Sequence, residues 1–466
     1  MLDTATIPVV PTPETTTETT PRTPPSVPER TPTGSIRFPT STGAIRTLGS
    51  NPATAPIVLH PGDAIPHARR VVYVILLGAL TALGPFTVDL YLPAFPIVES
   101  DCHTTAAMGQ LTLTGTMIGF GLGQLIVGPL SDKVGRRIPL LCVTALHILA
   151  SLCAALAPTL LLLGTARVFQ GIGAAAGGVV AMAMVRDLFG GRRLVVMLSR
   201  LALVSGVAPV LAPLVGSTLL LVMPWRGIFV VLAAYGAVML ACSLFILPET
   251  LPRARRHDRG ATTIRQRYRS VLSDRVFIGV MIIGAMTFSG LFSYLSSSSF
   301  LFQQGYGFTP QQFGLLFAAN SLGVVVGVQF ASRLAARFGP QWVMAWSTSV
   351  LVLASASIIV TDQLHLGLWG TIVPLFVFMT ACGFTFPCVQ VLALDRHGKA
   401  AGTAASLVGA ANNAVAGLVS PLVGWLSKDS GITATTMAGV MVGCALIGVA
   451  SLWLLVRPRS VPMLAP

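Results

Sequence analysis

Residues 71–98 read VVYVILLGALTALGPFTVDLYLPAFPIV, an apolar stretch with one charged residue, Asp89. A helix needs about 20 apolar residues to cross roughly 30 Å of hydrocarbon, so this stretch predicts a membrane span. Residues 104–130 form a second apolar stretch directly after it. The whole chain is 53% hydrophobic and 10% charged, whereas soluble domains carry about 25% charged residues. The sequence therefore predicts an integral membrane protein.

Further apolar stretches bring the number of predicted spans to twelve. They are predicted at 70–98, 104–130, 137–157, 159–185, 193–221, 225–247, 276–302, 310–336, 340–360, 366–392, 399–426 and 431–456. The longest break between them divides the spans six and six. We therefore expect an all-α membrane protein with twelve transmembrane helices in two pseudo-symmetric six-helix bundles.

The composition predicts five segments. Residues 1–68 are rich in Thr and Pro and have no apolar period, so we expect a disordered cytoplasmic tail. The first bundle occupies 69–247 and the second 276–457, with a basic cytoplasmic linker at 248–275 and a short C-terminal tail at 458–466. The first apolar stretch lacks a cleavage site after a short core, so we read it as a retained span.

The positive charges predict the orientation in the membrane. With the N-terminus in the cytoplasm, the predicted cytoplasmic segments beyond the distal tail carry 22 Lys and Arg, and the predicted outer loops carry two, Arg226 and Lys428. Cytoplasmic loops are enriched in Lys and Arg, so both termini are expected in the cytoplasm and the chain in the cytoplasmic (inner) membrane. The net charge of +14 is therefore explained by the orientation of the spans in the membrane. For this reason we expect no nucleic acid partner.

An internal repeat supports the division into two bundles. The stretch from Gly123 to Gly135 aligns with the stretch from Gly327 to Gly339 at a constant offset of 204 residues. Parallel repeats of this kind are a known transporter architecture. At the position of Asp132 the second copy has alanine, so only the first half keeps this acid.

Asp89 is the one acidic residue well inside a predicted span. An acid in hydrocarbon costs about 2.5–3.5 kcal/mol and normally faces a cavity with a function. Burial favours its neutral form, so such a group can take up and release a proton. The alternative is a structural acid paired with a neighbouring helix. Pro85, Pro93 and Pro96 flank it, so we expect the helix to bend there.

Arg167 in the fourth span is the matching embedded cation. Asp89, Gln170 or an anionic substrate could each be its partner. Arg200 in the fifth span lies close enough to the cytoplasmic end for its side chain to reach water. His147 in the third span is more often a hydrogen-bonded core histidine than a proton relay.

The most specific local motif is the loop GPLSDKVGRR at residues 128–137. Gly135 permits a tight turn, and Asp132 is expected near the start of the third span, where the helix dipole favours an acid. Such a cluster can hold neighbouring helix ends together. In the second span, Gly115, Gly119 and Gly123 recur every four residues, a spacing that lets helix backbones approach closely.

The sequence gives no sign of a metal or redox site. The seven cysteines show no CxxC or Cys/His ligand spacing. Six lie in apolar stretches, where a cysteine usually packs as a small residue, namely Cys142, Cys153, Cys242, Cys382, Cys388 and Cys444. Cys102 is expected to face outward. We find no arrangement of catalytic residues, and we expect neither an enzyme nor a bound cofactor, with a proton gradient as the energy source.

These motifs together resemble those of the Bcr/CflA branch of drug:proton antiporters in the major facilitator superfamily. Asp89 begins a run, DLYLPAFP, that is similar to the first-helix signature of the branch, and residues 128–137 resemble the loop motif of the superfamily. The stretch RVFQGIGAA from Arg167 resembles the fourth-span motif tied to proton transfer, and Arg186 with Asp187 closes this span as in the branch. The resemblance covers about 69–457. It departs in the fifth span, where Ala-Pro pairs stand in place of Gly-Pro.

The resemblance implies proton-coupled efflux of drug-like small molecules by alternating access. Asp89 and Arg167 would couple the proton, and Asp132 with Arg186 would latch the inward side. The full predicted latch comprises Gly128, Asp132, Gly135, Arg136, Arg137, Arg186 and Asp187. Residues that could line the substrate cavity are Tyr91, Gln170, Phe288, Phe292, Tyr294, Gln303, Asn320, Gln390 and Asn413.

Two alternatives stay open at the level of sequence. The chain could export a metabolite such as an amino acid or a sugar, or, more remotely, it could be a membrane sensor, scaffold or enzyme. We expect its partners to be a small-molecule substrate, protons and the lipid bilayer, and we expect a monomer.

Overall fold

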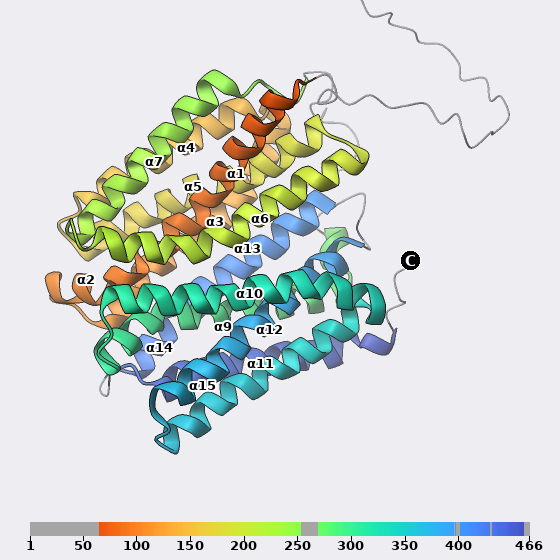
Figure 1. The fold of residues 1–466 in the computed structure, drawn as a ribbon. Helices are drawn as coiled ribbons and strands as arrows, with labels where there is room; N and C mark the ends of the chain where they lie inside the picture. Colours follow the sequence, from red (N-terminus) through yellow and green to blue (C-terminus); the bar gives the residue numbers. More distant parts are fainter. Residues whose placement is uncertain (1–64, 253–268, 396, 398–400, 429–430, 461–466) are drawn as a thin grey trace, which may run out of the picture. The chain divides into compact units, whose positions relative to one another are not determined.

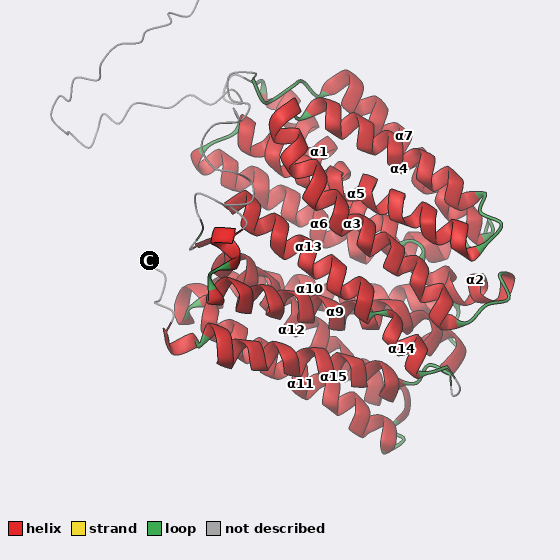
Figure 2. Cartoon of the chain, turned by 180° about the vertical axis from the view of Figure 1, so that it is seen from behind, coloured by secondary structure: helices red, strands yellow, loops and turns green. Residues whose placement is uncertain are grey.

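The computed structural model describes residues 65–252, 269–395, 397, 401–428 and 431–460. The predicted disordered tail therefore lies almost wholly outside the described residues, as does most of the basic linker. Within these ranges every regular element is a helix (Figure 2). Twelve helical segments are long and apolar enough to cross a membrane, which confirms the number of spans predicted from the sequence.

The first half supplies six spans. The first span is divided into α1 (His67–Asp89), a 3-10 turn (Leu92–Ala94) and α2 (Phe95–Asp101). The other five are α3 (Ala106–Val134), α4 (Arg137–Ala155), α5 (Leu160–Leu188), α6 (Gly191–Leu219) and α7 (Trp225–Ile246).

The second half supplies the other six spans (Figure 1). They are α9 (Arg275–Phe300) with a π-helical turn (Leu301–Gly305), α10 (Pro310–Phe338), α11 (Pro340–Gln363), α12 (Gly367–Asp395), α13 (Ala401–Val419) with α14 (Pro421–Leu426), and α15 (Ala434–Ser451) with a π-helical turn (Leu452–Val456). A 3-10 turn at Pro458–Ser460 ends the described chain.

The internal repeat extends to the geometry of the helices. α3 and α10 both contain 29 residues, and they begin and end at the same offset of 204 residues. Each begins after a threonine whose hydroxyl accepts a hydrogen bond from the third backbone N–H of the helix, Thr105 and Thr309. Each ends at a glycine with positive φ, Gly135 at 111° and Gly339 at 84°, a conformation that favours glycine. The same local signals therefore build the second helix of each half.

The glycines of α3 allow a close contact with α5. A Cβ atom added at Gly115, Gly119 or Gly123 would lie 2.7, 2.0 or 2.8 Å from a backbone carbonyl oxygen of α5. The carbonyls belong to Gly164, Val168 and Ile172. The predicted close approach is thus present, and α5 is the partner. In the second half, Gly327 of α10 meets α12 in the same way, at 2.3 Å from the Thr380 carbonyl oxygen.

Two ends of the helical array are useful for locating residues. One end is where α3 meets α4 and α5 meets α6, and we call it the basic end. It carries Lys133, Arg136, Arg137 and Arg186. The opposite end is where α2 meets α3, α6 meets α7 and the π-helical turn after α9 meets α10. The predicted orientation would put the basic end in the cytoplasm.

Contacts between the halves involve α3 with α13, α6 with α10, and α9 with several helices of the first half (Figure 1). At the opposite end, Gln110 of α3 donates to the Ser296 carbonyl at 3.2 Å and accepts from the Gly424 N–H at 3.1 Å. Gln303 donates to the Pro93 carbonyl at 3.0 Å, and Phe95 packs against Phe300 with ring centroids 5.7 Å apart. The halves are therefore joined at the opposite end.

The end of α9 is unusually enclosed. Every residue from Phe292 to Phe302 is buried, a run of about three helical turns with no exposed face. It includes the four serines 296–299, and Ser297 donates back to the Ser293 carbonyl of its own helix. Back-bonding of this kind lets hydroxyls lie in an apolar environment with their hydrogen bonds satisfied.

Two sequence-based expectations about packing are wrong. Cys142 and Cys153 do not pack in the interior but are exposed, whereas Cys382, Cys388 and Cys444 are buried as expected. Cysteine is small and apolar enough for a lipid-facing surface, so an apolar stretch does not reveal which face it occupies. Asp132 is not at the start of the third span, because α3 continues through it to Val134.

Candidate functional site

Asp89 is the last residue of α1 and is 5% exposed. After Asp89 the helix is interrupted by the 3-10 turn at Leu92–Ala94, which contains Pro93. The helix then resumes as α2. Proline lacks the N–H that a continuous helix would need, so the predicted break follows the prolines. The carboxyl group thus lies at an interruption within the first span.

Asp89 faces the second half of the chain. Its carboxyl group lies near enough to Tyr294 of α9 for the two to interact electrostatically. The Asn320 amide donates to the Tyr294 hydroxyl at 3.1 Å, and the Phe317 ring stacks on the Tyr294 ring at 5.7 Å. Asn320 and Phe317 both belong to α10, so the acid of the first half lies near a polar group held by two helices of the second.

Arg167 of α5 is completely buried. Its Nη1 donates to the Thr87 carbonyl of α1 at 2.9 Å and to Gln170 Oε1 at 2.7 Å. The guanidinium also lies over the rings of Tyr91 and Phe229, 5.1 and 5.6 Å from their centroids. Of the partners proposed from the sequence, Gln170 is the one the structure provides, and the bond to Thr87 fixes the backbone two residues before Asp89.

A chain of buried polar groups continues from Arg167. Gln170 Nε2 donates to the Ser151 hydroxyl at 2.8 Å, and Ser151 donates to the His147 carbonyl at 2.7 Å. His147 Nδ1 lies 3.3 Å from the Gln170 carbonyl. His147 is therefore a hydrogen-bonded core histidine, as expected. Ser151 was missed from the sequence, since a serine in an apolar span carries no signal of its own.

The loop after α3 is organised by Arg136. Its guanidinium pairs with Asp132 one turn before it and, at 2.9 Å, with Asp187 at the end of α5. It also donates to the Ser131 hydroxyl at 2.8 Å. Burial alone lowers the pKa of Arg136, but the hydrogen bond to Asp187 and the charges of Asp132 and Asp187 outweigh it and raise this pKa above its usual value. The cation is thus fixed between two acids.

Glu249 adds a second tie at this loop. Its carboxylate accepts from the backbone N–H of Arg136 at 2.8 Å and of Arg137 at 3.2 Å. An acid is favoured by the helix dipole at this place, the start of α4. The dipole argument made for Asp132 applies instead to Glu249, which follows α7 and was missed because it is far away in sequence.

The latch predicted from the resemblance is partly different in the structure. Asp132 pairs with Arg136 and not with Arg186, which is exposed and has no ion pair among the described residues. Asp187 supplies the contact to α5. Gly135 makes the turn, and Gly128 packs against Val179 of α5, with a Cβ added there lying 3.7 Å from its side chain.

The residues predicted to line a cavity occupy several places. Tyr91 and Gln170 lie with Arg167 in the first half, and Gln303 bonds Pro93 at the opposite end. Phe288 and Phe292 contact each other, with ring centroids 4.6 Å apart. Asn413 is buried on α13 and Gln390 is exposed on α12. The group that meets at the junction of the halves is Asp89, Tyr294 and Asn320.

Twelve spans, an internal repeat and charged groups buried among the spans are typical of a membrane transporter. The sequence matches the family model described as Major Facilitator Superfamily over residues 75–421 and 306–465. The chain belongs to this superfamily of transporters, and the expectation that it is not an enzyme is confirmed with it. It is a multi-pass membrane protein whose family implies a small-molecule substrate.

Relatives of known sequence agree with this assignment. The chain is 35% identical over 393 residues to an uncharacterized MFS-type transporter, YdgK, of Bacillus subtilis, covering 84% of this chain and 97% of the relative. It is 29% identical to a bicyclomycin resistance protein homolog of Haemophilus influenzae, covering 82% and 96%. It is 30% identical to the multidrug resistance protein MdtL of Escherichia fergusonii, covering 79% and 92%.

Solved structures support the fold. A bacterial homolog of the lysosomal transporter Spinster, in an inward-facing and unoccupied conformation, matches with a TM-score of 0.66 at 15% identity. The match covers 84% of this chain and 98% of that structure. The predicted major facilitator fold is therefore confirmed, and the family model confirms the predicted superfamily.

Proposed function

We propose that this transporter exports drug-like small molecules across the cytoplasmic membrane in exchange for protons. The observation that carries the proposal is the place of Asp89, a buried acid at an interruption of the first span that faces Tyr294 of the other half. The free-energy cost of burying a carboxyl group there is lowest when the group is neutral or has a cationic partner. A proton and a cationic substrate would therefore occupy it in turn.

Alternating occupation is what exchange requires. With substrate bound from the cytoplasm, the carboxylate has a partner and needs no proton. After the substrate leaves on the outer side, a proton from outside neutralises the acid and allows the empty carrier to return. Because Asp89 belongs to one half and Tyr294 and Asn320 to the other, a change in its charge would act on the junction that must change as the halves move.

Arg167 has a positioning role in this scheme. Its bond to the Thr87 carbonyl holds the end of α1, and its place between Tyr91 and Phe229 keeps its own charge away from water. It would tune the acid without taking part in the exchange.

The cluster around Arg136 would act on the conformational equilibrium. It ties the α3–α4 loop to the ends of α5 and α7 at the basic end, through Asp187 and Glu249. These ties lie within the first half, so they make its basic end one rigid unit. Asp132 pairs with Arg136 but is half exposed, so the second half would be able to reach its carboxylate when the basic end closes.

The relatives support drug-like substrates, since two of them are described as resistance proteins. The second candidate, export of a metabolite such as an amino acid or sugar, fits the same acid and the same loop. A drug-sensitive host that lacks its own efflux pumps separates the two. The wild-type chain should lower ethidium accumulation and raise drug tolerance, and the Asp89→Asn variant at equal membrane level should do neither. Unchanged ethidium with raised release of a labelled amino acid or sugar would favour the metabolite exporter.

A further inference from the structure

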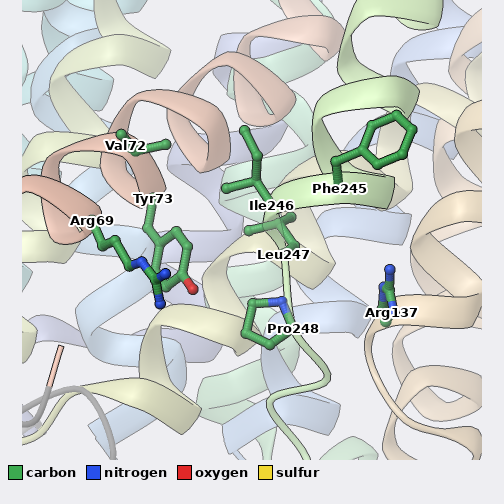
Figure 3. Close-up of a pocket in the computed structure, with 8 residues that line it drawn as sticks. All are labelled: Arg69, Val72, Tyr73, Arg137, Phe245, Ile246, Leu247 and Pro248. Atoms are coloured by element: carbon green, nitrogen blue, oxygen red, sulfur yellow. The ribbon is translucent and has the colours of Figure 1, made fainter.

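A pocket with a volume of about 520 Å³ lies at the basic end of the first half (Figure 3). It is formed where α1 and α4 begin and where α7 ends. Its lining consists of Arg69, Val72, Tyr73, Arg137, Phe245, Ile246, Leu247 and Pro248. The contacts of Arg167 to Thr87, Gln170, Tyr91 and Phe229 involve none of these lining residues, and the pocket has no part in the exchange described above.

The pocket combines two cations at its rim. Arg69 is exposed on the first turn of α1, and Arg137 is the first residue of α4. In the view of Figure 3 the two lie on either side of Pro248, with Tyr73 beside Arg69. The neighbouring carboxylate of Glu249 accepts from the backbone N–H of Arg137 at 3.2 Å. Two guanidinium groups without an acid among the lining residues favour an anion.

Arg137 has a buried hydrogen-bond donor without an acceptor among the described residues. Arg137 Nη2 donates to the Leu244 carbonyl, but its Nε is buried and has no partner among the described residues. A buried donor without a partner costs about 1–3 kcal/mol, so it is an observation that points to a missing acceptor. A phosphate oxygen at the rim would satisfy it.

The other wall of the pocket is apolar, and its side chains are exposed on the outer surface of the helices. Phe245 is 83% exposed, Val72 41% and Ile246 38%. They lie on the last turn of α7 and the first turns of α1, both of which are membrane spans. Aromatic and aliphatic side chains exposed at the end of a span meet lipid chains. The ligand that fits is therefore anionic at one end and apolar at the other.

We propose that this pocket binds an anionic phospholipid, with its phosphate between Arg69 and Arg137 and an acyl chain along Val72 and Phe245. Basic pockets between the cytoplasmic ends of spans suit such headgroups. The internal repeat makes the site specific to the first half. The position equivalent to Arg137 at the offset of 204 residues is Gln341, so the second half lacks this cation.

The test uses the purified full-length protein in neutral detergent, titrated with phosphatidylglycerol and observed by native mass spectrometry. The wild type should bind phosphatidylglycerol at least several-fold more tightly than phosphatidylcholine. One cation near a lipid surface is worth roughly a fivefold change in affinity. Arg69→Gln should thus weaken phosphatidylglycerol binding about fivefold, and Arg69→Lys should stay close to wild type.

Arg333→Gln is the matched control. Arg333 is also exposed at the basic end and lies over an aromatic ring, that of Phe330 at 5.5 Å, but it does not line this pocket. Its loss should leave lipid binding unchanged. Equal loss in Arg69→Gln and Arg333→Gln, or equal binding of the two lipids, would overturn the proposal. Competition by inorganic phosphate at low concentration would also overturn it, since the site would then recognise a free anion.

A second measurement needs no variant. Phosphatidylglycerol with a photoreactive acyl chain should label the wild-type protein on the peptides that contain Val72 or Phe245. Unlabelled phosphatidylglycerol should suppress the label and phosphatidylcholine should not. Labelling spread evenly over all spans would show that no such site exists, even if Arg69→Gln failed to fold.

Discussion

Arg167 shows how the chain keeps a full charge within its spans. The guanidinium is fully buried, and the structure surrounds it with two oxygen acceptors and two aromatic rings. Arginine suits this place because its planar group donates along several directions while its faces lie on rings. The side chain joins α5 to α1 at Thr87, so its effect on Asp89 passes through the backbone.

We predict that Arg167→Lys inserts normally but is less stable and transports several-fold more slowly. An ammonium group cannot reach the Thr87 carbonyl and Gln170 while also lying flat between the rings, and a lost hydrogen bond to a charged group costs about 2 kcal/mol. Thermal unfolding in detergent and efflux in cells measure the two effects. Arg200→Lys is the control, since Arg200 is exposed on α6. Equal behaviour of the two variants would mean that the Arg167 contacts are unimportant.

At the scale of elements, α3 and α5 are in contact through backbone. The Cβ of any other residue at Gly119 would lie 2.0 Å from the Val168 carbonyl oxygen, far inside contact distance. The two helices would have to separate, and with them the loop that carries Asp132 and the helix that carries Arg167. The packing of this pair therefore sets the geometry of both functional clusters.

Gly119→Val should lower the free energy of unfolding by about 1–3 kcal/mol, the usual cost of overpacking. Gly443→Val is a suitable control, because a Cβ at Gly443 of α15 meets nothing within 4 Å. The melting temperatures of both variants in the same detergent give the comparison. A melting temperature for Gly119→Val equal to that of Gly443→Val would be incompatible with backbone contact between α3 and α5.

The α3–α4 loop gives a second prediction at this scale. Asp132→Asn should slow transport and leave substrate affinity nearly unchanged, because Asp132 pairs with Arg136 at the basic end and would act on the conformational equilibrium, not at the proposed substrate site. Ala336→Asp, at the equivalent place in the second half, should have a much smaller effect. Binding and transport rates of purified protein separate these cases. A roughly tenfold change in affinity with normal cycling would assign Asp132 to the substrate site.

At the scale of the whole molecule, hydrophobicity and charge predicted much of the architecture. Twelve spans, their division into two halves and the repeat follow from the lengths of the apolar stretches and from the recurrence of Gly123 to Gly135 at Gly327 to Gly339. The break after Asp89 followed from its prolines. Each of these features depends on residues that are close together in the sequence, namely on the length of an apolar stretch, a recurring motif or the position of a proline.

Contacts between distant residues could not be predicted in this way. The sequence showed that Asp89 and Arg167 are charges in apolar stretches, but it could not show that Arg167 bonds Thr87 or that Asp89 faces Tyr294. Glu249 was missed for the same reason. Such pairs depend on how helices are rotated and shifted against each other, and one apolar face resembles another in composition.

The N-terminal segment 1–60 is the largest part of the chain whose role is a prediction. It has neither an apolar face nor a stretch of membrane length, so we predict from the sequence that it buries little surface. Its removal should leave insertion and efflux unchanged, provided that Arg69 and Arg70 remain to hold the N-terminus inside. Efflux rates of full and shortened chains at matched membrane expression are the measurement. A several-fold change in rate would reveal a regulatory segment.

The central claim, that Asp89 couples export to protons, is tested most directly in proteoliposomes with an acidic lumen. With its basic end facing outward, the wild type should accumulate a drug such as ethidium in the lumen while protons leave, and a protonophore should abolish the accumulation. Asp89→Asn should reconstitute equally well, accumulate no drug against its gradient, and show a residual flux that the protonophore does not change. Full gradient-driven accumulation by Asp89→Asn would contradict the account.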